Sequence, residues 1–308
     1  MADVLITVLM SVHNEEKNID EAIQSILAQT YDNFEFIIID DNSTDRTVER
    51  ILNYDDKRII FLQNSVNKGL TKNLNYGIKL AKGKYILRMD GDDISLQNRF
   101  EKQIEFMEEH PEIALSGCWI KEFGKSNNVL KTVTDIDLIK LGLIFNNVMV
   151  HSTFIIRKEF LDRYRIKYDE KLRYAQDYMF VYQISQKGLI TNLPIVLLKY
   201  RIHSNQISTK KSELQLECAD MTRKVVLRDL GIKLNIASFQ LWSDFCNRIR
   251  RKLSFRDVIT LLNIVKLIIS QNQKRAVYHE FKLKEQLYSR LKEYCESNIK
   301  IIGLIHFK

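Results

Sequence analysis

Residues 4–45 read VLITVLMSVHNEEKNIDEAIQSILAQTYDNFEFIIIDDNSTD, and two short apolar runs punctuate this stretch. The first run, at residues 4–12, is rich in β-branched residues and predicts a strand. Apolar residues at helical spacing follow between residues 19 and 27. The second run, FEFIIID at residues 34–40, predicts a buried strand. Strand, helix and strand in this order favour a parallel βαβ unit.

The same alternation continues beyond this stretch. We expect two further helices and two further strands, at residues 43–54, 70–83, 58–64 and 84–89 respectively. Ser43 or Thr44 is the expected N-cap of the first helix, and Gly83 is expected to close the second. Repeated units of this kind predict an α/β fold with a doubly wound, mostly parallel sheet. In such sheets, ligands bind beyond the carboxyl ends of the strands.

Polar clusters follow three of the predicted strands at the points where these strands end. They are HNEE at residues 13–16, DDNSTD at 40–45 and DGDD at 90–93. An isolated DGDD is most often a solvated turn, in which Asp and Gly serve the backbone. A calcium loop is excluded because Ile94 occupies a ligand position and Ser95 replaces the required glycine.

A third interpretation of DGDD is a divalent cation bound by Asp90 and Asp92. Two carboxylates with one residue between them can converge on one ion, and Mg²⁺ typically takes one or two carboxylates plus phosphate oxygens. Such an ion would carry the diphosphate of a nucleotide. The other two clusters at the same sheet end favour this interpretation, because Asp41 suits the N–H of a nucleobase or a ribose hydroxyl.

The remainder of the chain changes in character along its length. A helix at residues 96–110, a strand at 113–120 and a mixed region follow DGDD, and helical periodicity dominates from about residue 210. We therefore place a domain boundary near residue 206. Residues 205–308 hold 20 Lys and Arg against 10 Asp and Glu, so the excess behind the net charge of +8 lies there.

Composition and termini limit the class of protein. The apolar share of 45% and the charged share of 28% are those of a globular protein. The four cysteines form no C-x-x-C pair, which predicts reduced thiols rather than a zinc site or disulfides. The acidic start at Met1-Ala-Asp3 predicts no signal peptide, and the apolar stretch at residues 258–270 is too short to span a bilayer. We therefore expect a cytoplasmic protein.

Four ordered motifs resemble those of family 2 glycosyltransferases with the GT-A fold. They are VLMSVHNEEKNIDEAIQSILAQTYDNFEFIIIDDNSTDRT, NKGLTKNLNYGIKLAKGKYILRMDGDD, RFEKQIEFMEEHPEIALSG, and finally AQDYMF with YRIHSNQIS. The resemblance covers about residues 4–208. It implies a Rossmann-like GT-A domain at residues 1–205, with a nucleotide-sugar half at about 1–93 and an acceptor half at about 94–205. An α-helical C-terminal extension would occupy residues 206–308.

The resemblance also implies roles for individual residues. The donor-binding residues would be Val12, Asn14, Glu15, Asp41, Asn67, Asp90, Asp93 and Arg201. Asp41 would take the uracil of a UDP-sugar, and Asp93 would face the donor sugar. Mn²⁺ or Mg²⁺ would be bound by Asp92 and Asp90, which form a DXD motif, and by His203 in YRIH. Asp177 in AQDY would be the general base.

Some of these residues also have simpler explanations. Asp is favourable in the first turn of any helix, which applies to Asp177. His203, and equally His151, could be buried histidines with structural hydrogen bonds. The chain also departs from the family, because Ser11, Leu74 and Gln176 stand where many members have Pro, Arg and Glu. Lys72 on the same helix could replace the missing Arg.

The expected function is metal-dependent, inverting transfer of a hexosyl or N-acetylhexosaminyl group from a nucleotide diphosphate donor. The acceptor would be a surface glycan such as lipopolysaccharide, or a lipid-linked precursor. The leaving diphosphate needs its charge neutralised, and the acceptor hydroxyl needs a base. A sugar nucleotidyltransferase of similar fold is the nearest alternative, although the loop after the first strand lacks the expected glycine. The second alternative is a non-enzymatic basic binding protein. The acidic clusters at the end of the sheet disfavour nucleic acid as the partner of such a protein.

The C-terminal region joins basic clusters to an apolar stretch of helix length, FCNRIRRKLSFRDVITLLNIVKLIISQNQKR at residues 245–275. This composition is typical of a segment that lies on anionic lipid. A solvated basic face on an ordinary helix is the competing interpretation. Peripheral attachment to the inner face of the cell membrane, where a lipid-linked acceptor is found, therefore stays open.

Overall fold

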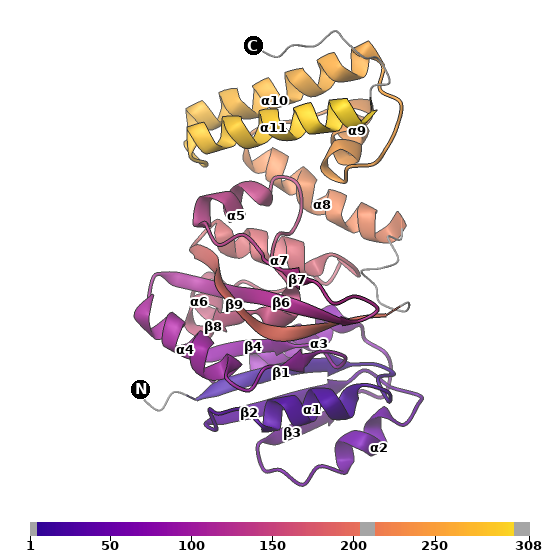
Figure 1. The fold of residues 1–308 in the computed structure, drawn as a ribbon, viewed down its shortest axis with the longest axis vertical. Helices are drawn as coiled ribbons and strands as arrows, with labels where there is room; N and C mark the ends of the chain where they lie inside the picture. Colours follow the sequence, from indigo (N-terminus) through magenta and orange to yellow (C-terminus); the bar gives the residue numbers. More distant parts are fainter. Residues whose placement is uncertain (1–4, 204–212, 299–308) are drawn as a thin grey trace. The chain divides into compact units, whose positions relative to one another are not determined.

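The computed structural model describes residues 5–203 and 213–298 (Figure 1). The chain divides into two compact units, which we call the sheet unit and the helical unit. The sheet unit comprises Met1–Ile139 and Val148–Cys218, and the helical unit comprises Lys140–Asn147 and Ala219–Lys308. The boundary predicted near residue 206 falls in residues 204–212, outside the described residues.

The first half of the sheet unit alternates parallel strands with helices. Its elements are β1 (Ile6–Val12), α1 (Ile19–Leu27), β2 (Phe34–Asp40), α2 (Thr47–Leu52), β3 (Ile59–Gln63), α3 (Leu70–Leu80) and β4 (Tyr85–Met89). The strands pair in the order β3-β2-β1-β4, and every one of these pairs is parallel. The predicted α/β class with a doubly wound sheet is therefore confirmed.

Helices cover both faces of this sheet because side chains alternate along each strand. Ile6, Val8 and Met10 of β1 belong to one core, together with buried residues of α1 and α4. Leu9 points to the opposite face and meets α3. A Cβ atom at Gly77 of α3 would lie 2.1 Å from Leu9 Cδ1, so only glycine allows this helix to approach the sheet so closely.

The second half of the sheet unit is mixed. Its elements are β5 (Ile94–Ser95), α4 (Arg99–Glu109), β6 (Ile113–Gly124), β7 (Val129–Leu130), the first turn of α5 (Ile136–Gly142), the 3₁₀ turn His151–Thr153, β8 (Ile155–Arg157), α6 (Lys158–Tyr164), α7 (Gln176–Ser185) and β9 (Leu189–Ile202). The sheet continues from β4 in the order β8-β6-β9-β5, with β7 on β6. β8 is antiparallel to both neighbours, so β4, β6 and β9 run in the same direction.

The helical unit contains α9 (Ile236–Cys246), α10 (Phe255–Arg275), α11 (Glu280–Asn298) and most of α8 (Glu213–Asp229). Figure 1 shows α10 and α11 side by side. The inserted residues 140–147 supply Phe145, whose ring centroid lies 5.9 Å from that of Trp242. Arg223 Nε donates a hydrogen bond of 2.7 Å to the Phe145 carbonyl. No helix among the described residues is long and apolar enough to cross a membrane.

Two predicted helix ends are wrong. α2 begins at Thr47 with Arg46 as N-cap and no side-chain cap, because Ser43 and Thr44 bind the loop after β1 instead. α3 ends at Leu80, three residues before Gly83. Gly83 is required for another reason, since a Cβ atom there would lie 2.4 Å from the backbone nitrogen of Thr7.

Candidate active site

The strand register brings the three polar clusters to one edge of the sheet. Val12 of β1 lies opposite Asp40 of β2, and Met10 of β1 lies opposite Met89 of β4. HNEE, DDNSTD and DGDD follow these residues, so they emerge beside one another. This is the carboxyl end of the parallel strands, where ligands bind in open α/β sheets.

Three carboxylates converge in the loop after β4. One oxygen atom from each of Asp90, Asp92 and Asp93 lies within 4.8 Å of the others. Asp93 is fully buried, and its Oδ2 atom has no hydrogen bond of good geometry among the described residues, although the Ser152 hydroxyl is close enough to act against the rise of the Asp93 pKa. Three carboxylates so close together are costly unless their charge is compensated, and a hard divalent cation that prefers oxygen ligands would compensate it. The donor set therefore fits Mg²⁺ or Mn²⁺.

The electrostatics of this cluster agree with a cation site. Burial raises the pKa of the Asp93 carboxyl well above its ordinary value, and the carboxylates of Asp90 and Asp92 add to this. Burial and Asp90 raise the pKa of Asp92. Burial likewise raises the pKa of Glu15 to about 7, with contributions from Asp92 and Asp90. Negative charge is therefore concentrated beyond what the surrounding protein neutralises.

Gly91 allows the DGDD loop to approach the loop after β1. A Cβ atom at this position would lie 2.7 Å from Val12 Cγ1 and 3.4 Å from Glu15 Cγ. Val12 is buried, and Glu15 is partly exposed beside the carboxylates. The structure thus places these two predicted donor-binding residues directly against the acidic loop.

Asp41 organises the loop that leads into α3. Its oxygens accept hydrogen bonds of 2.8 Å from the backbone nitrogens of Lys68 and Gly69, and one of 3.0 Å from Asn64 Nδ2. Burial acts to raise the pKa of Asp41, but these hydrogen bonds hold it below its ordinary value. Asn67 is exposed in the same loop. The carboxylate of Asp41 is therefore ionised and fixed in place.

Asn14 occupies an exposed turn with a left-handed backbone (φ 57°). Its backbone nitrogen donates to Ser43 Oγ at 2.9 Å, and its Oδ1 accepts from the backbone nitrogen of Thr44 at 2.8 Å. Asn tolerates this backbone region better than most residues. The loops after β1 and β2 are thus tied together on the nucleotide side of the predicted site.

Arg201 and His203 at the end of β9 contact the acidic loop. The Arg201 backbone nitrogen donates to Asp93 Oδ1 at 3.0 Å, and Arg201 Nε donates to the Asp92 carbonyl at 2.7 Å. His203 Nε2 lies 3.0 Å from Asp92 Oδ2. The Arg201 guanidinium also pairs with Glu21 and stacks on Phe123. Both predicted residues lie beside the carboxylates, and Arg201 braces their loop.

Asp177 lies on a separate element, in the first turn of α7. Helix α3 holds the loop before it, because Thr71 Oγ1 donates to the Leu172 carbonyl at 3.0 Å. Asn75 Oδ1 accepts from the backbone nitrogen of Tyr168 at 2.9 Å, and Asn75 Nδ2 donates to its carbonyl at 3.0 Å. Burial raises the pKa of the Tyr168 phenol, and the carboxylates of Asp177 and Asp90 both add to this. Both aspartates therefore lie within electrostatic reach of one buried residue.

Buried polar residues beneath the acidic loop escape the motif comparison. Arg88 is almost fully buried in β4 and pairs with Asp90. Arg99 is fully buried and donates to the Arg88 carbonyl at 3.0 Å, and burial lowers the pKa of its guanidinium to about 10. The Tyr168 hydroxyl lies 2.7 Å from His151 Nε2. The signal that was available is the charge of Arg88 within the apolar run KYILRM.

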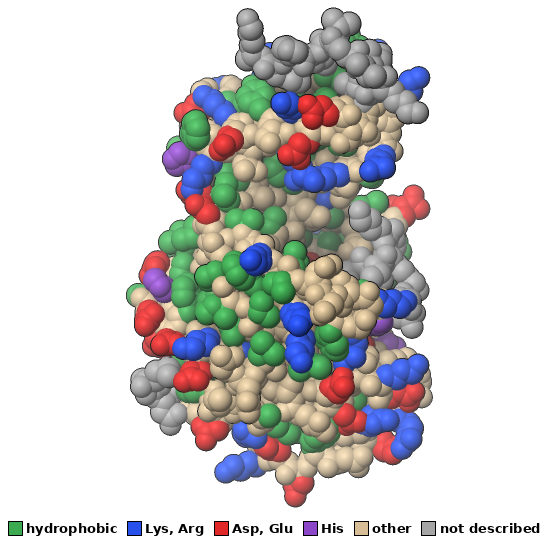
Figure 2. Space-filling model, in the orientation of Figure 1, with side chains coloured by type: hydrophobic (Ala, Val, Ile, Leu, Met, Phe, Trp, Pro, Cys, Tyr) green, Lys and Arg blue, Asp and Glu red, His purple; other side chains and the backbone are tan. Residues whose placement is uncertain are grey.

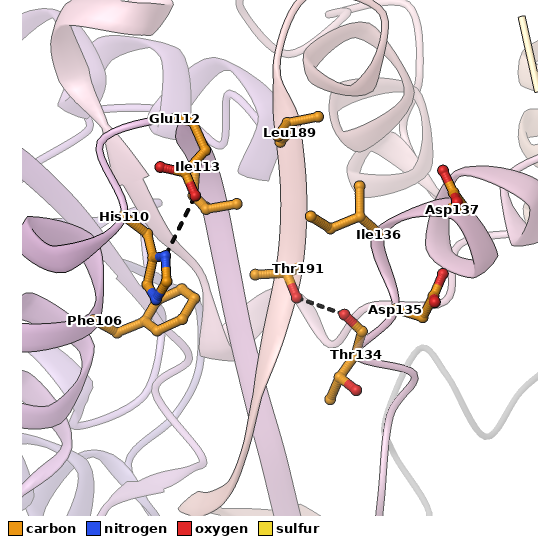
Figure 3. Close-up of a pocket in the computed structure, with 10 residues that line it drawn as sticks. All are labelled: Phe106, His110, Glu112, Ile113, Thr134, Asp135, Ile136, Asp137, Leu189 and Thr191. Carbon is orange, nitrogen blue, oxygen red and sulfur yellow. Dashed lines mark hydrogen bonds and ion pairs between the residues drawn. The ribbon is translucent and has the colours of Figure 1, made fainter.

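A cavity of about 570 Å³ lies elsewhere in the sheet unit (Figure 3). It opens where β6 and β9 begin, near His110, Leu189 and Thr191, whereas the carboxylates follow the end of β4. Because these strands run in the same direction, the cavity lies at the opposite edge of the sheet. Hydrophobic side chains also gather in Figure 2 where Figure 1 shows β6, β7 and β9. Neither region holds the convergent carboxylates.

Comparisons with known proteins identify the family. Residues 7–168, more than half of the chain, match the family model described as Glycosyl transferase family 2. An uncharacterized glycosyltransferase of Haemophilus influenzae is 32% identical over 249 residues, which cover 75% of this chain and 77% of that protein. The UDP-Glc:alpha-D-GlcNAc-diphosphoundecaprenol beta-1,3-glucosyltransferase WfaP of Escherichia coli is 30% identical over 231 residues, covering 74% and 88%.

A solved structure supports the same assignment at the level of the fold. S. aureus TarS 1–349 in complex with UDP-GlcNAc superimposes with a TM-score of 0.66 at 17% sequence identity. The match covers 97% of this chain and 94% of that one. At this identity the likeness concerns the fold alone, and it confirms the GT-A fold with C-terminal helices. On the match to the family model and to the Haemophilus influenzae relative, the chain belongs to glycosyl transferase family 2.

Proposed function

We propose that this protein is a metal-dependent, inverting glycosyltransferase that moves a hexosyl or N-acetylhexosaminyl group from a nucleotide diphosphate, with a UDP-sugar as first choice. The observation that carries the proposal is the convergence of three carboxylates at the sheet edge, with Asp177 on a separate element. The names of WfaP and of the TarS complex support a UDP-sugar donor. The name of WfaP also supports an acceptor linked to diphosphoundecaprenol, that is, a lipid-linked acceptor.

Donor binding is divided among the loops that meet at this edge. The nucleoside side comprises Val12, Asn14, Glu15, Asp41 and Asn67. The cation side comprises Asp90, Asp92 and His203, with Asp93 directed to the donor sugar and Arg201 holding the loop in place or approaching the phosphates. A bound Mg²⁺ or Mn²⁺ would supply Lewis-acid neutralisation of the charge that develops on the leaving diphosphate.

Asp177 performs the proton transfer in this proposal. The acceptor hydroxyl attacks the anomeric carbon as its proton passes to the Asp177 carboxylate, and a new C–O bond forms. The bond to the diphosphate breaks on the opposite face, and the nucleoside diphosphate leaves with the electron pair. The N-terminal end of α7 favours the ionised carboxylate that a base requires. One displacement of this kind inverts the anomeric configuration.

Family membership favours this reaction over the two alternatives that the sequence leaves open. A sugar nucleotidyltransferase would form the nucleotide sugar rather than use it. A non-enzymatic basic binding protein would not need the buried acidic loop with its three convergent carboxylates. Neither alternative is supported by a further observation.

A thermal-shift panel tests the donor class. UDP-, GDP-, dTDP- and CMP-sugars are each added with Mn²⁺ or with EDTA, and the midpoint of unfolding is measured. Ligands that bind only the folded state raise this midpoint. We expect stabilisation by a UDP-sugar that requires Mn²⁺. Stabilisation that is equal in EDTA would contradict the metal assignment, and stabilisation restricted to another nucleotide would correct the donor.

A further inference from the structure

The connection between α9 and α10 presents a dense set of exposed cations. We call residues 248–256, RIRRKLSFR, the basic loop. All of its residues are exposed except Leu253, which anchors the loop in the core of the helical unit. Phe255 is 78% exposed, although burying a phenylalanine is normally favourable. Ile249 is exposed as well, and Ile259 is exposed one helical turn after Phe255.

The basic loop is held in a defined conformation. Arg248 follows Asn247, the C-cap of α9, with a left-handed backbone (φ 52°), and the Ile249 carbonyl accepts from the Tyr294 hydroxyl at 2.9 Å. The backbone nitrogen of Arg251 donates to Asn298 Oδ1 at 2.7 Å. Ser254 begins α10 through a reciprocal capping box with Asp257. These contacts fix the backbone on both sides of the exposed side chains.

Most of the positive charge of the basic loop is not neutralised within the protein. Arg251 pairs with Asp244 at 2.6 Å, and Arg248 pairs with Glu293 at 3.2 Å. Arg250, Lys252 and Arg256 form no ion pair with any residue of 5–203 or 213–298. A fixed loop therefore carries three cations outside the ion pairs of the described residues, together with an exposed aromatic ring, and Asp257 beside Arg256 is the nearest carboxylate in sequence.

We infer that the basic loop docks the protein on an anionic lipid bilayer, with Phe255 and Ile249 entering the boundary between headgroups and acyl chains. This inference rests on the proposed lipid-linked acceptor, which a membrane would present. Arg250, Lys252 and Arg256 contact the lipid phosphates, and each contributes electrostatic attraction near an anionic surface. A nucleic acid would use the cations but would leave the aliphatic Ile249 and Ile259 without an apolar phase.

Vesicle co-sedimentation tests the inference on the full chain. The vesicles contain equal amounts of phosphatidylglycerol and phosphatidylcholine, or phosphatidylcholine alone. The loop variant carries Arg250→Glu, Lys252→Glu and Phe255→Ser. The matched control carries Lys274→Glu, Lys292→Glu and Phe281→Ser, because these side chains are also exposed in the helical unit. We expect the wild type and the control to bind the anionic vesicles.

The loop variant is expected to lose at least about 25-fold in partitioning, since each of its two missing cations is worth about five-fold before the loss of Phe255 is counted. Equal binding by the loop variant and the control overturns the inference. The inference is also overturned if the wild type binds a DNA duplex but binds neither kind of vesicle. A chain ending at Asn298 is measured alongside, because residues 299–308, IKIIGLIHFK, are apolar and basic. Loss of binding in this chain but not in the loop variant also overturns the inference.

Transfer to a water-soluble acceptor separates the two proposals. Vesicle binding without any sugar transfer would leave the docking surface standing and contradict the proposed function. Sugar transfer without vesicle binding would support the proposed function and contradict the docking surface.

Discussion

The loop after β4 and the basic loop before α10 are both densely charged, but they hold their charges in opposite ways. In the first, Asp93 is fully buried, and Arg88 and Arg99 lie beneath the carboxylates. In the second, Arg250 and Lys252 are exposed and form no ion pair with the residues that the structure describes. Burying a charge is costly unless it is compensated, so buried charge indicates a fixed chemical task. Exposed charge close in sequence to an exposed aromatic ring indicates a docking surface.

The largest expected effect separates the base from the donor site. Replacing Asp177 with Asn leaves its shape but removes the proton acceptor, so turnover should fall by about 1,000-fold. Donor affinity should stay unchanged, because Asp177 lies on α7 and the carboxylate triad follows β4. Steady-state transfer and calorimetric UDP titration measure the two properties. Asp162→Asn, an exposed change on α6, is the control, and full turnover in Asp177→Asn would refute the base assignment.

The next prediction tests whether Arg88 is the internal counter-charge of the triad. Arg88→Gln breaks a mostly buried ion pair, and we expect a loss of about 2–3 kcal/mol in the free energy of unfolding in EDTA. A bound cation replaces the missing charge, so Mn²⁺ should narrow the difference from the wild type. Urea unfolding with EDTA and with Mn²⁺ measures this.

Arg46→Gln is the control for Arg88, because Arg46 forms an exposed pair with Glu49 that contributes little. We expect it to leave the free energy of unfolding unchanged in both solutions. A loss in Arg88→Gln that Mn²⁺ does not reduce would show that Arg88 serves packing rather than the charge balance of the site.

Sequence reasoning succeeded where local pattern and function coincide. The strand at Phe34–Asp40 was predicted to the residue, because a continuous β-rich apolar run bounded by polar residues has few alternatives. The polar clusters were found because they follow strand ends. Their roles in the donor site stay predictions, since the structure shows proximity but no ligand.

Sequence reasoning failed where a side chain contacts a residue that lies far away along the chain. Ser43 has the sequence position of an N-cap, but its Oγ atom accepts a hydrogen bond from the backbone nitrogen of Asn14 on the neighbouring loop. Arg88 looks like an outlier in an apolar run until the triad above it is seen. Residues 140–147 join the helical unit through contacts such as Arg223 with Phe145, which no local pattern encodes. Such contacts depend on the whole fold, so they become visible only in three dimensions.

A smaller effect concerns the pH dependence of stability near the acidic loop. The pKa of Glu15 is raised to about 7 in the folded protein, so the folded state binds this proton more tightly than the unfolded chain. The resulting stabilisation is complete below the unfolded pKa and is lost as pH rises through about 7. We expect a contribution of roughly 1–2 kcal/mol, reduced from the full shift because Glu15 is partly exposed.

Glu15→Gln isolates this contribution. Urea unfolding of the wild type and the variant in EDTA, at mildly acidic and mildly alkaline pH, gives the difference in the free energy of unfolding. Relative to the variant, the wild type should lose stability as pH rises. A difference that does not change with pH would contradict the raised pKa of Glu15, which burial causes first and Asp92 and Asp90 increase.

The smallest expected effect is that of the basic-loop substitutions on the rate of sugar transfer. Arg250→Glu, Lys252→Glu and Phe255→Ser replace exposed side chains of the helical unit, whereas the acidic loop belongs to the sheet unit. Turnover with a water-soluble acceptor should therefore stay within about two-fold of the wild type, as for other surface substitutions. Initial rates at saturating donor measure this. A large fall would mean that the basic loop also serves the reaction, and that the two charged loops are not functionally separate.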